Sequence, residues 1–118
     1  MRSFVRALLT FILVWVLACV DKPTEHRVRA NAFLRSGDAT AALKECELGL
    51  EQSSNDVSLL ILKGKALFEL ERMDESRMAY DKAVAAGKEQ PQTLGEARLG
   101  LAMIATRQQQ WDVAKEQF

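Results

Sequence analysis

The hydrophobic pattern of the chain changes after its first twenty residues. Residues 7–18 form an uncharged, mostly apolar run that follows Arg2 and Arg6. From residue 24 onward, apolar and polar positions follow helical spacing, and the helix formers Ala, Leu, Glu, Lys, Gln and Arg dominate. That part lacks the alternation of Val, Ile and Thr that is typical of strands. The pattern therefore predicts an all-α protein with a short apolar segment in front.

A repeated spacing of side-chain sizes relates two stretches of the helical part. Side chains of similar size recur at an interval of about 34 residues, which is a period typical of helical repeats. Two antiparallel helices pack closely only where their side chains are small. Residues 71–84 are interpreted as a turn and the second helix of such a pair. Asp38 and Asp74 are expected to cap the second helices. The recurring pairs are Ala30 and Gly64, Ala42 and Ser76, Cys46 and Tyr80, and Gly49 and Ala83.

These residues resemble the tetratricopeptide repeat, which has this same period. The resemblance covers residues 23–118 and implies a right-handed solenoid of tandem antiparallel helix pairs, with repeats at about 23–56, 57–90 and 93–118. In the third repeat, residues 93–96 are expected to form a capping box. Ala102 is expected to be the small residue at the contact between the helices, and Asp112 is expected to begin the second helix. Because that repeat stops at Phe118, we expect a longer array, with a covering subunit as the alternative.

The apolar run near the start is short for a membrane span, which needs roughly 18 or more apolar residues. It fits the hydrophobic region of a secretory signal. Residues 16–19 (Val-Leu-Ala-Cys) resemble a lipobox, the motif at which a lipoprotein signal is cut and its Cys acylated. The resemblance implies a signal peptide at 1–18, lipidation of Cys19 and a short tether at 19–22. The alternatives are an uncleaved signal anchor and a cleaved soluble protein.

The residue after the lipidated Cys bears on the membrane that holds the protein. In Gram-negative lipoproteins, an Asp at that place favours retention at the inner membrane, and Val20 occupies it here. The resemblance therefore implies an outer-membrane lipoprotein that faces the periplasm, with the inner membrane as the second location. Two or more acyl chains would hold the protein there stably.

Composition and motifs exclude several classes of function. The 16 Lys and Arg residues balance the 16 Asp and Glu residues, so no basic excess predicts nucleic-acid binding. His26 is expected to be a packing or surface residue and Cys46 an inert core thiol, so we expect no metal and no cofactor. The spacing of Gly95 and Gly100 lacks the Lys and Ser or Thr of a phosphate loop. We therefore expect neither an enzyme nor a small-molecule substrate.

The resemblance places the function in a concave groove lined by the first helices. Arg27 and Asn31 resemble half of the carboxylate clamp of chaperone-binding relatives, but Leu62, Glu96 and Gly100 replace the other half. A mixed apolar and basic groove suits an amphipathic or extended segment of a partner protein. The predicted groove residues are Arg27, Asn31, Arg35, Ile61, Lys65, Phe68, Leu99, Met103 and Arg107, with Phe68 as the main anchor.

We therefore expect a membrane-tethered adaptor or scaffold of the bacterial envelope that binds other proteins. The resemblance suggests the assembly of a pilus, secretin or polysaccharide-export complex as the kind of task it serves. One alternative is the non-catalytic N-terminal repeat region of a longer envelope enzyme, and another is an inner-membrane protein held by an uncleaved helix. Further repeats or catalytic motifs after Phe118 would separate the first two, and the mass of the mature N-terminus would identify the third.

Overall fold

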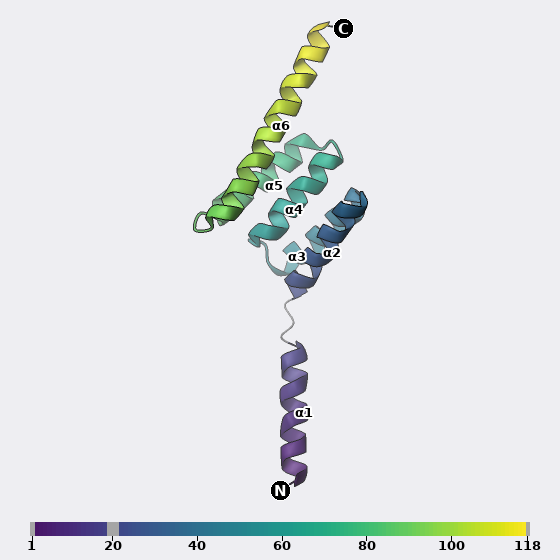
Figure 1. The fold of residues 1–118 in the computed structure, drawn as a ribbon, viewed down its shortest axis with the longest axis vertical. Helices are drawn as coiled ribbons and strands as arrows, with labels where there is room; N and C mark the ends of the chain where they lie inside the picture. Colours follow the sequence, from purple (N-terminus) through teal and green to yellow (C-terminus); the bar gives the residue numbers. More distant parts are fainter. Residues whose placement is uncertain (1, 19–21, 118) are drawn as a thin grey trace.

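All regular secondary structure in the part of the chain that the structure describes is helical (Figure 1). This structure is a computed structural model, and it describes residues 2–18 and 22–117. Within these ranges the helices are α1 (Arg2–Ala18), α2 (Lys22–Ser36), α3 (Ala39–Gln52), α4 (Val57–Glu69), α5 (Met73–Ala86) and α6 (Pro91–Gln117). The prediction of an all-α protein is confirmed.

Two successive helix pairs of similar geometry form the centre of the fold. α2 packs on α3, and α4 packs on α5. α3 and α5 are equal in length, and both ends of α5 follow the corresponding ends of α3 by the same interval, which is the repeat period of about 34 residues. The turns that precede these helices also correspond, because Gly37 has φ of 84° and Glu71 has φ of 59°. The fold is therefore repeat-like, with second helices of equal length entered through left-handed turn residues.

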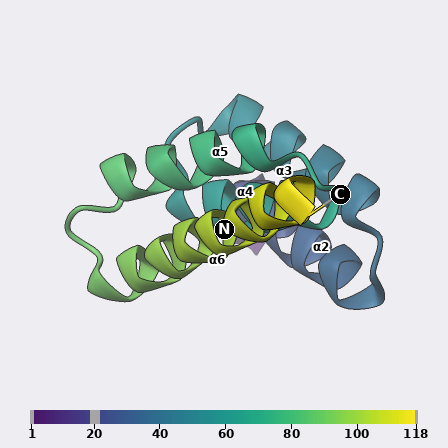
Figure 2. The ribbon, with the colours of Figure 1, turned by 90° about the horizontal axis from the view of Figure 1, so that it is seen from above.

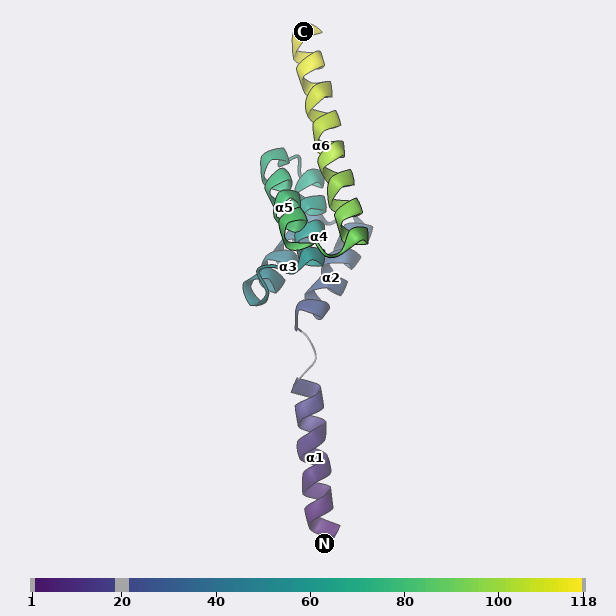
Figure 3. The same cartoon turned by 90° about the vertical axis from the view of Figure 1, so that its left-hand side faces the viewer.

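α4 lies between two layers of helices. It contacts α2 and α6 as well as α3 and α5. Figures 2 and 3 show α3 and α5 on one side of α4, and α2 and α6 on the other. No Cα atom of α2 lies within 8 Å of α6, and none of α3 lies within 8 Å of α5. On each side of α4, two helices that do not contact each other therefore flank its surface. They are α2 and α6 on one side, and α3 and α5 on the other.

Small residues allow the close helix contacts that the sequence predicts. A Cβ atom on Gly64 would lie 2.8 Å from Cζ of Tyr80, so only glycine accepts the ring there. The buried Ser76 hydroxyl donates a hydrogen bond of 2.7 Å to the Gly64 carbonyl oxygen and thereby links α5 to α4. The other predicted contact residues are also buried, namely Ala30, Ala42, Cys46, Gly49 and Ala83.

α6 differs from the predicted third helix pair. It continues as one helix through Trp111 and Asp112, so Asp112 does not begin a second helix. Ala102 is exposed rather than packed, because no second helix of the described chain returns against it. Residues 105–110 (Ala-Thr-Arg-Gln-Gln-Gln) contain neither Gly nor Pro, and most of them favour helix. Nothing in this stretch therefore interrupts the helix as Gly37 interrupts the chain between α2 and α3.

Besides Asp112, three helix starts were predicted, of which one is correct and two are wrong. Asp38 caps α3 as expected, with its carboxylate accepting a hydrogen bond of 3.0 Å from the Ala41 amide. Asp74 does not cap α5, which begins one residue earlier, and lies instead in its first turn. The capping box at residues 93–96 is also wrong, because α6 begins at Pro91. Proline suits the first position of a helix, where no intrahelical partner is needed for its missing N–H.

α1 stands apart from the other helices. None of its described residues comes within contact distance of α2 to α6. Its apolar side chains between Phe4 and Val14 are more than half exposed. In the ranges 2–18 and 22–117, no helix combines the length and apolar character needed to cross a bilayer. Cys19, the predicted lipidation site, lies outside the described residues.

Candidate functional site

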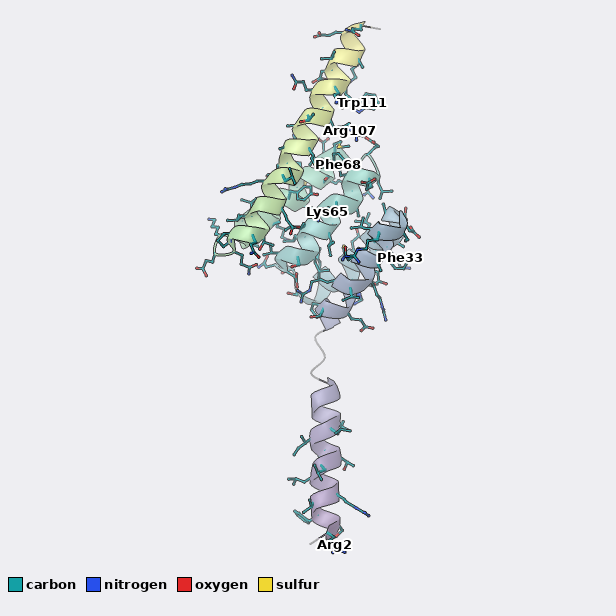
Figure 4. All side chains as sticks on the ribbon, in the orientation of Figure 1. Arg2, Phe33, Lys65, Phe68, Arg107 and Trp111 are labelled. Atoms are coloured by element: carbon teal, nitrogen blue, oxygen red, sulfur yellow. The ribbon has the colours of Figure 1, made fainter. Side chains whose placement is uncertain are left out.

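A groove lies over the side of α4 that faces α2 and α6. Two adjoining hollows form it, one of about 300 Å³ with a mainly apolar lining and one of about 420 Å³ with a more polar lining. Lys65 and Glu96 belong to both hollows. Figure 4 shows Lys65 and Phe68 on α4, between α2 and α6. We call this surface the front groove.

The apolar hollow is assembled from residues that are distant in sequence. α2 contributes Leu34, α4 contributes Phe68, and α6 contributes Leu99 and Met103. Leu99 is 63% exposed and Met103 is 47% exposed, so this part of α6 presents apolar surface to solvent. A contiguous apolar surface with polar neighbours is typical of a site where another molecule binds.

The ring of Tyr80 forms the floor of the apolar hollow because two glycines make room for it. A Cβ atom at Gly64 or at Gly100 would overlap the outer edge of the ring. Tyr80 therefore reaches from α5 between α4 and α6 into the hollow. Its burial, with smaller contributions from Glu96 and Glu69, raises the pKa of the phenol to about 12. The floor is therefore uncharged at neutral pH.

Arg107 covers one end of the apolar hollow. Figure 4 labels Arg107 on α6 and Phe68 on α4. The guanidinium carbon of Arg107 lies 5.0 Å from the centre of the Phe68 ring, and its Nη1 lies 2.6 Å from Oε1 of Glu71. A cation over an aromatic face contributes about 0.5–1 kcal/mol at an exposed site. Because Arg107 and Glu71 are both substantially exposed, the pair is weak enough for a ligand to rearrange it.

The polar hollow is rich in hydrogen-bond donors. Arg27 donates through Nη2 to the Thr24 hydroxyl at 2.9 Å, whereas its Nε is buried without a hydrogen-bond partner in the described chain. The nearest carboxylate oxygen, on Asp56, is 3.7 Å from that Nε. A buried donor without a hydrogen bond is costly, and the ion pair with Asp56 offsets part of that cost. The hollow is lined by Arg27, Val28, Asn31, Ser58, Ile61, Leu62, Lys65, Thr93 and Glu96.

An ion pair separates the two hollows. The Nζ atom of Lys65 lies 3.3 Å from Oε2 of Glu96 and joins α4 to α6. Both side chains are about half exposed, so solvent weakens this attraction. A ligand that spans the front groove therefore passes over a charged pair between an apolar end and a polar end.

The structure brings most of the predicted groove residues together. Arg27, Asn31, Ile61 and Lys65 line the polar hollow, while Lys65, Phe68, Leu99 and Met103 line the apolar hollow. Arg107 lies at the rim over Phe68, and Arg35 is exposed in the last turn of α2 and lines neither hollow. The role of all these predicted groove residues in binding remains a prediction.

Sequence reasoning missed the contribution of Tyr80 and Gly100 to the lining. Tyr80 entered the sequence analysis only as a recurring position of the repeat, and the structure buries it, since only 3% of it is exposed. The signal that could have revealed this contribution was Gly100, a second glycine that lies on the following helix. A large ring on one helix that meets small residues on two others predicts that the ring passes between them.

The remaining candidate groups lie outside the front groove. His26 Nδ1 is 2.7 Å from Oε2 of Glu45, so this pair joins α2 to α3. Burial raises the pKa of Cys46 to about 12, which keeps the thiol protonated and unreactive at neutral pH. Within residues 2–18 and 22–117, no three His, Cys, Asp or Glu side chains gather as ligands for a metal ion.

Comparison with known proteins adds no relative to these observations. No protein family, no curated protein and no solved structure matches this chain. The residues of the chain and their geometry therefore supply the whole basis for a functional assignment.

Proposed function

We propose that this chain is an adaptor that is tethered to a membrane and binds a segment of another protein in its front groove. The observation that supports the proposal most strongly is the convergence of α2, α4 and α6 on one concave surface. That surface has an apolar end, a donor-rich end and no gathered metal-binding groups in the described chain. Such a surface suits binding rather than a reaction of its own.

The proposal includes the finer assignment of the fold. We assign α2–α3 and α4–α5 to two tetratricopeptide repeats and α6 to the first helix of a third. The equal lengths of α3 and α5, their offset by one repeat period and the matching turns at Gly37 and Glu71 support this assignment. In such a right-handed solenoid the first helices line the concave side, which is where the front groove lies.

The bound segment is expected to place a large apolar side chain beside Phe68, Leu99 and Met103. Burying a leucine-sized or phenylalanine-sized side chain contributes about 1.5–3 kcal/mol, and a few such anchors supply most of the affinity of an interface. The donors of the polar hollow, Arg27 and Asn31, are expected to receive carbonyl or carboxylate oxygens of the same segment. An amphipathic or extended protein segment provides both kinds of group.

The membrane tether is the part of the proposal that rests on the sequence alone. In this proposal, residues 1–18 are a signal peptide and Cys19 is acylated, so the domain is held at the periplasmic face of the outer membrane. The exposed apolar side chains of α1 and its lack of contacts with the other helices support a separate role for this segment. Assembly of an envelope complex such as a pilus, secretin or export machine is the kind of task that fits.

Mass spectrometry of the mature protein tests the tether. An N-terminal Cys19 carrying acyl chains is the expected result. An intact Met1 would exclude acylation there and would support a protein held by its uncleaved apolar helix.

Co-purification from the membrane fraction tests the front groove. The full chain is expected to recover a defined envelope protein, and Phe68→Ala is expected to lose it. Val113→Ala is a matched control, since this exposed apolar residue of α6 lines neither hollow. Recovery of the same proteins by the Phe68→Ala variant and the unaltered chain would reject the front groove as the binding site.

A further inference from the structure

A second groove lies on the opposite side of α4, between α3 and α5. It encloses about 330 Å³, and its apolar floor includes Leu60 and Leu67 of α4. Figures 2 and 3 show α3 and α5 on the side of α4 that faces away from α2 and α6. We call this surface the back groove. The proposed function does not use it.

The two lysines of α4 lie in opposite grooves. Lys65 lines the front groove and pairs with Glu96. Lys63 lines the back groove together with Lys82 of α5, and neither of these has an ion-pair partner among the described residues. Two cations of the back groove therefore lack an ion-pair partner within 4 Å in the described chain, although Arg72 and, more weakly, Lys63 lower the pKa of the Glu75 carboxyl.

The one carboxylate that lines the back groove is already occupied. Both oxygens of Glu75 accept hydrogen bonds from Arg72, at 2.8 Å and 2.6 Å. Because α5 runs antiparallel to α4, Glu75 lies near Leu67 and Lys82 lies near Leu60. Lys82 therefore lies toward the end of the groove away from Glu75, and Lys63 lies between the two ends.

Apolar surface is exposed beside these cations. Met78 lies between Glu75 and Lys82 along α5 and is 70% exposed. Methionine is flexible and polarisable, and it adapts to varied apolar side chains at binding surfaces. An apolar floor, an exposed methionine and two free lysines complement a ligand that is both apolar and acidic.

We propose that the back groove is a second docking surface, which binds an acidic amphipathic segment of a partner protein. The apolar side chains of the segment cover Met78 and the leucines of the floor, while its carboxylates pair with Lys63 and Lys82. Since the two grooves face in opposite directions, one chain can hold two different segments at the same time. This surface is independent of the front groove, and either can fail without the other.

Two synthetic peptides of equal length test the proposal. Both carry leucines on one helical face, and one has flanking glutamates where the other has lysines. Their affinities for the full chain are measured by fluorescence anisotropy, at a fixed concentration of mild detergent. We expect the acidic peptide to bind more tightly, with an affinity that falls as salt is added.

A charge reversal then locates the binding. The double variant Lys63→Glu, Lys82→Glu is expected to bind the acidic peptide about tenfold more weakly, since two attractive pairs become repulsive. The same variant is expected to bind the basic peptide more tightly. Met78→Ser is expected to weaken both peptides without unfolding, because Met78 is exposed. Lys88→Glu with Lys115→Glu is the matched control, because it makes the same change of net charge at exposed sites outside both grooves.

Three results would overturn the proposal. The first is equal affinity for the two peptides, and the second is the same loss with the control reversal as with the groove reversal. The third is the absence of peptide binding together with weaker binding of the Lys63→Glu, Lys82→Glu variant to phosphatidylglycerol vesicles, which would assign the lysines to a membrane surface instead.

Discussion

Two glycines of α6 are expected to respond in opposite ways to the same substitution. A Cβ atom at Gly95 would meet nothing within 4 Å beyond its chain neighbours and the backbone of its own helix, whereas one at Gly100 would overlap the ring of Tyr80. Both positions lie inside the helix, where alanine is favoured over glycine by about 0.8–1.0 kcal/mol. Gly95→Ala is therefore expected to raise the free energy of unfolding by about 1 kcal/mol.

Gly100→Ala gains the same helix propensity but crowds the core. Overpacking a filled core costs about 1–3 kcal/mol. The upper part of that range applies, because Gly64 holds the same edge of the Tyr80 ring from the other side and the ring has no free direction to move. Subtracting the gain in propensity leaves a net loss of about 2 kcal/mol. The two variants are therefore expected to differ in stability by about 3 kcal/mol.

Urea unfolding followed by far-ultraviolet circular dichroism measures both variants against the unaltered chain. In a Tyr80→Leu background, where the outer ring atoms are missing, Gly100→Ala is expected to become stabilising like Gly95→Ala. This reversal distinguishes contact with the ring from any other effect of alanine at that position. If Gly100→Ala stabilises the unaltered chain as much as Gly95→Ala does, the described docking of α6 on α5 is wrong.

The same unfolding measurement tests three further features. Asp38→Ala removes the cap of α3 and should cost about 1 kcal/mol, whereas Asp112→Ala, within the continuous α6, should change stability by less than about 0.5 kcal/mol, and equal losses would restore a helix start at Asp112. Gly37→Ala should cost about 1 kcal/mol because of its left-handed backbone, while Glu71→Gly should be neutral or stabilising, and the opposite order would contradict the turn geometry. Burial raises the pKa of Cys46 from 9.0 to about 12, so the unfolded chain loses its thiol proton first. Stability should therefore fall as pH rises from about 9 toward 12, and Cys46→Ala should flatten this fall; an unchanged slope would show that the thiol is not buried.

The repeat spacing could be predicted because it follows from local periodicity, and the resemblance to a repeat family then indicated the face of the groove. Ala30 and Gly64 each lie on a first helix at a place where a neighbouring helix leaves no room for a larger side chain. Once that face of the helix is fixed, the opposite face follows from the rotation of about 100° per residue. Ile61, Lys65 and Phe68 were predicted as groove residues from the resemblance to the tetratricopeptide repeat, and the helical rotation explains why Lys65 and Phe68 can line the groove while Gly64 is buried.

The end of a helix was harder to predict than its buried face. A second helix was expected to begin at Asp112 because Asp often caps helices, but a cap works only where the preceding residues leave the helix. The earlier turns contain Gly37 and the left-handed Glu71, while residues 105–110 have no such residue. Predicting a helix start at Asp112 therefore also required a residue before it that ends the preceding helix.

Contacts between helices were not predictable from spacing along the chain. Ion pairs at a spacing of three or four residues, such as Glu25 with Arg29, can be inferred from the sequence of one helix. The structure also joins Lys65 to Glu96 and Glu71 to Arg107, across 31 and 36 residues. These pairs depend on how α6 lies over α4, which no pattern within a single helix specifies.

Tyr80 connects the packing of the helices to the depth of the front groove, and this limits how the two grooves can vary. Its ring packs against Gly64 and Gly100 and is also the floor of the apolar hollow. A larger residue at either glycine displaces the ring, and a smaller residue at position 80 deepens the hollow only by weakening the core. The back groove has no such constraint at Lys63, Met78 and Lys82, since these side chains lie at its surface and outside both apolar core clusters. The front groove is therefore expected to change its ligand mainly through Leu99 and Met103, whereas the back groove can change both its charge and its apolar surface without altering the packing of α4.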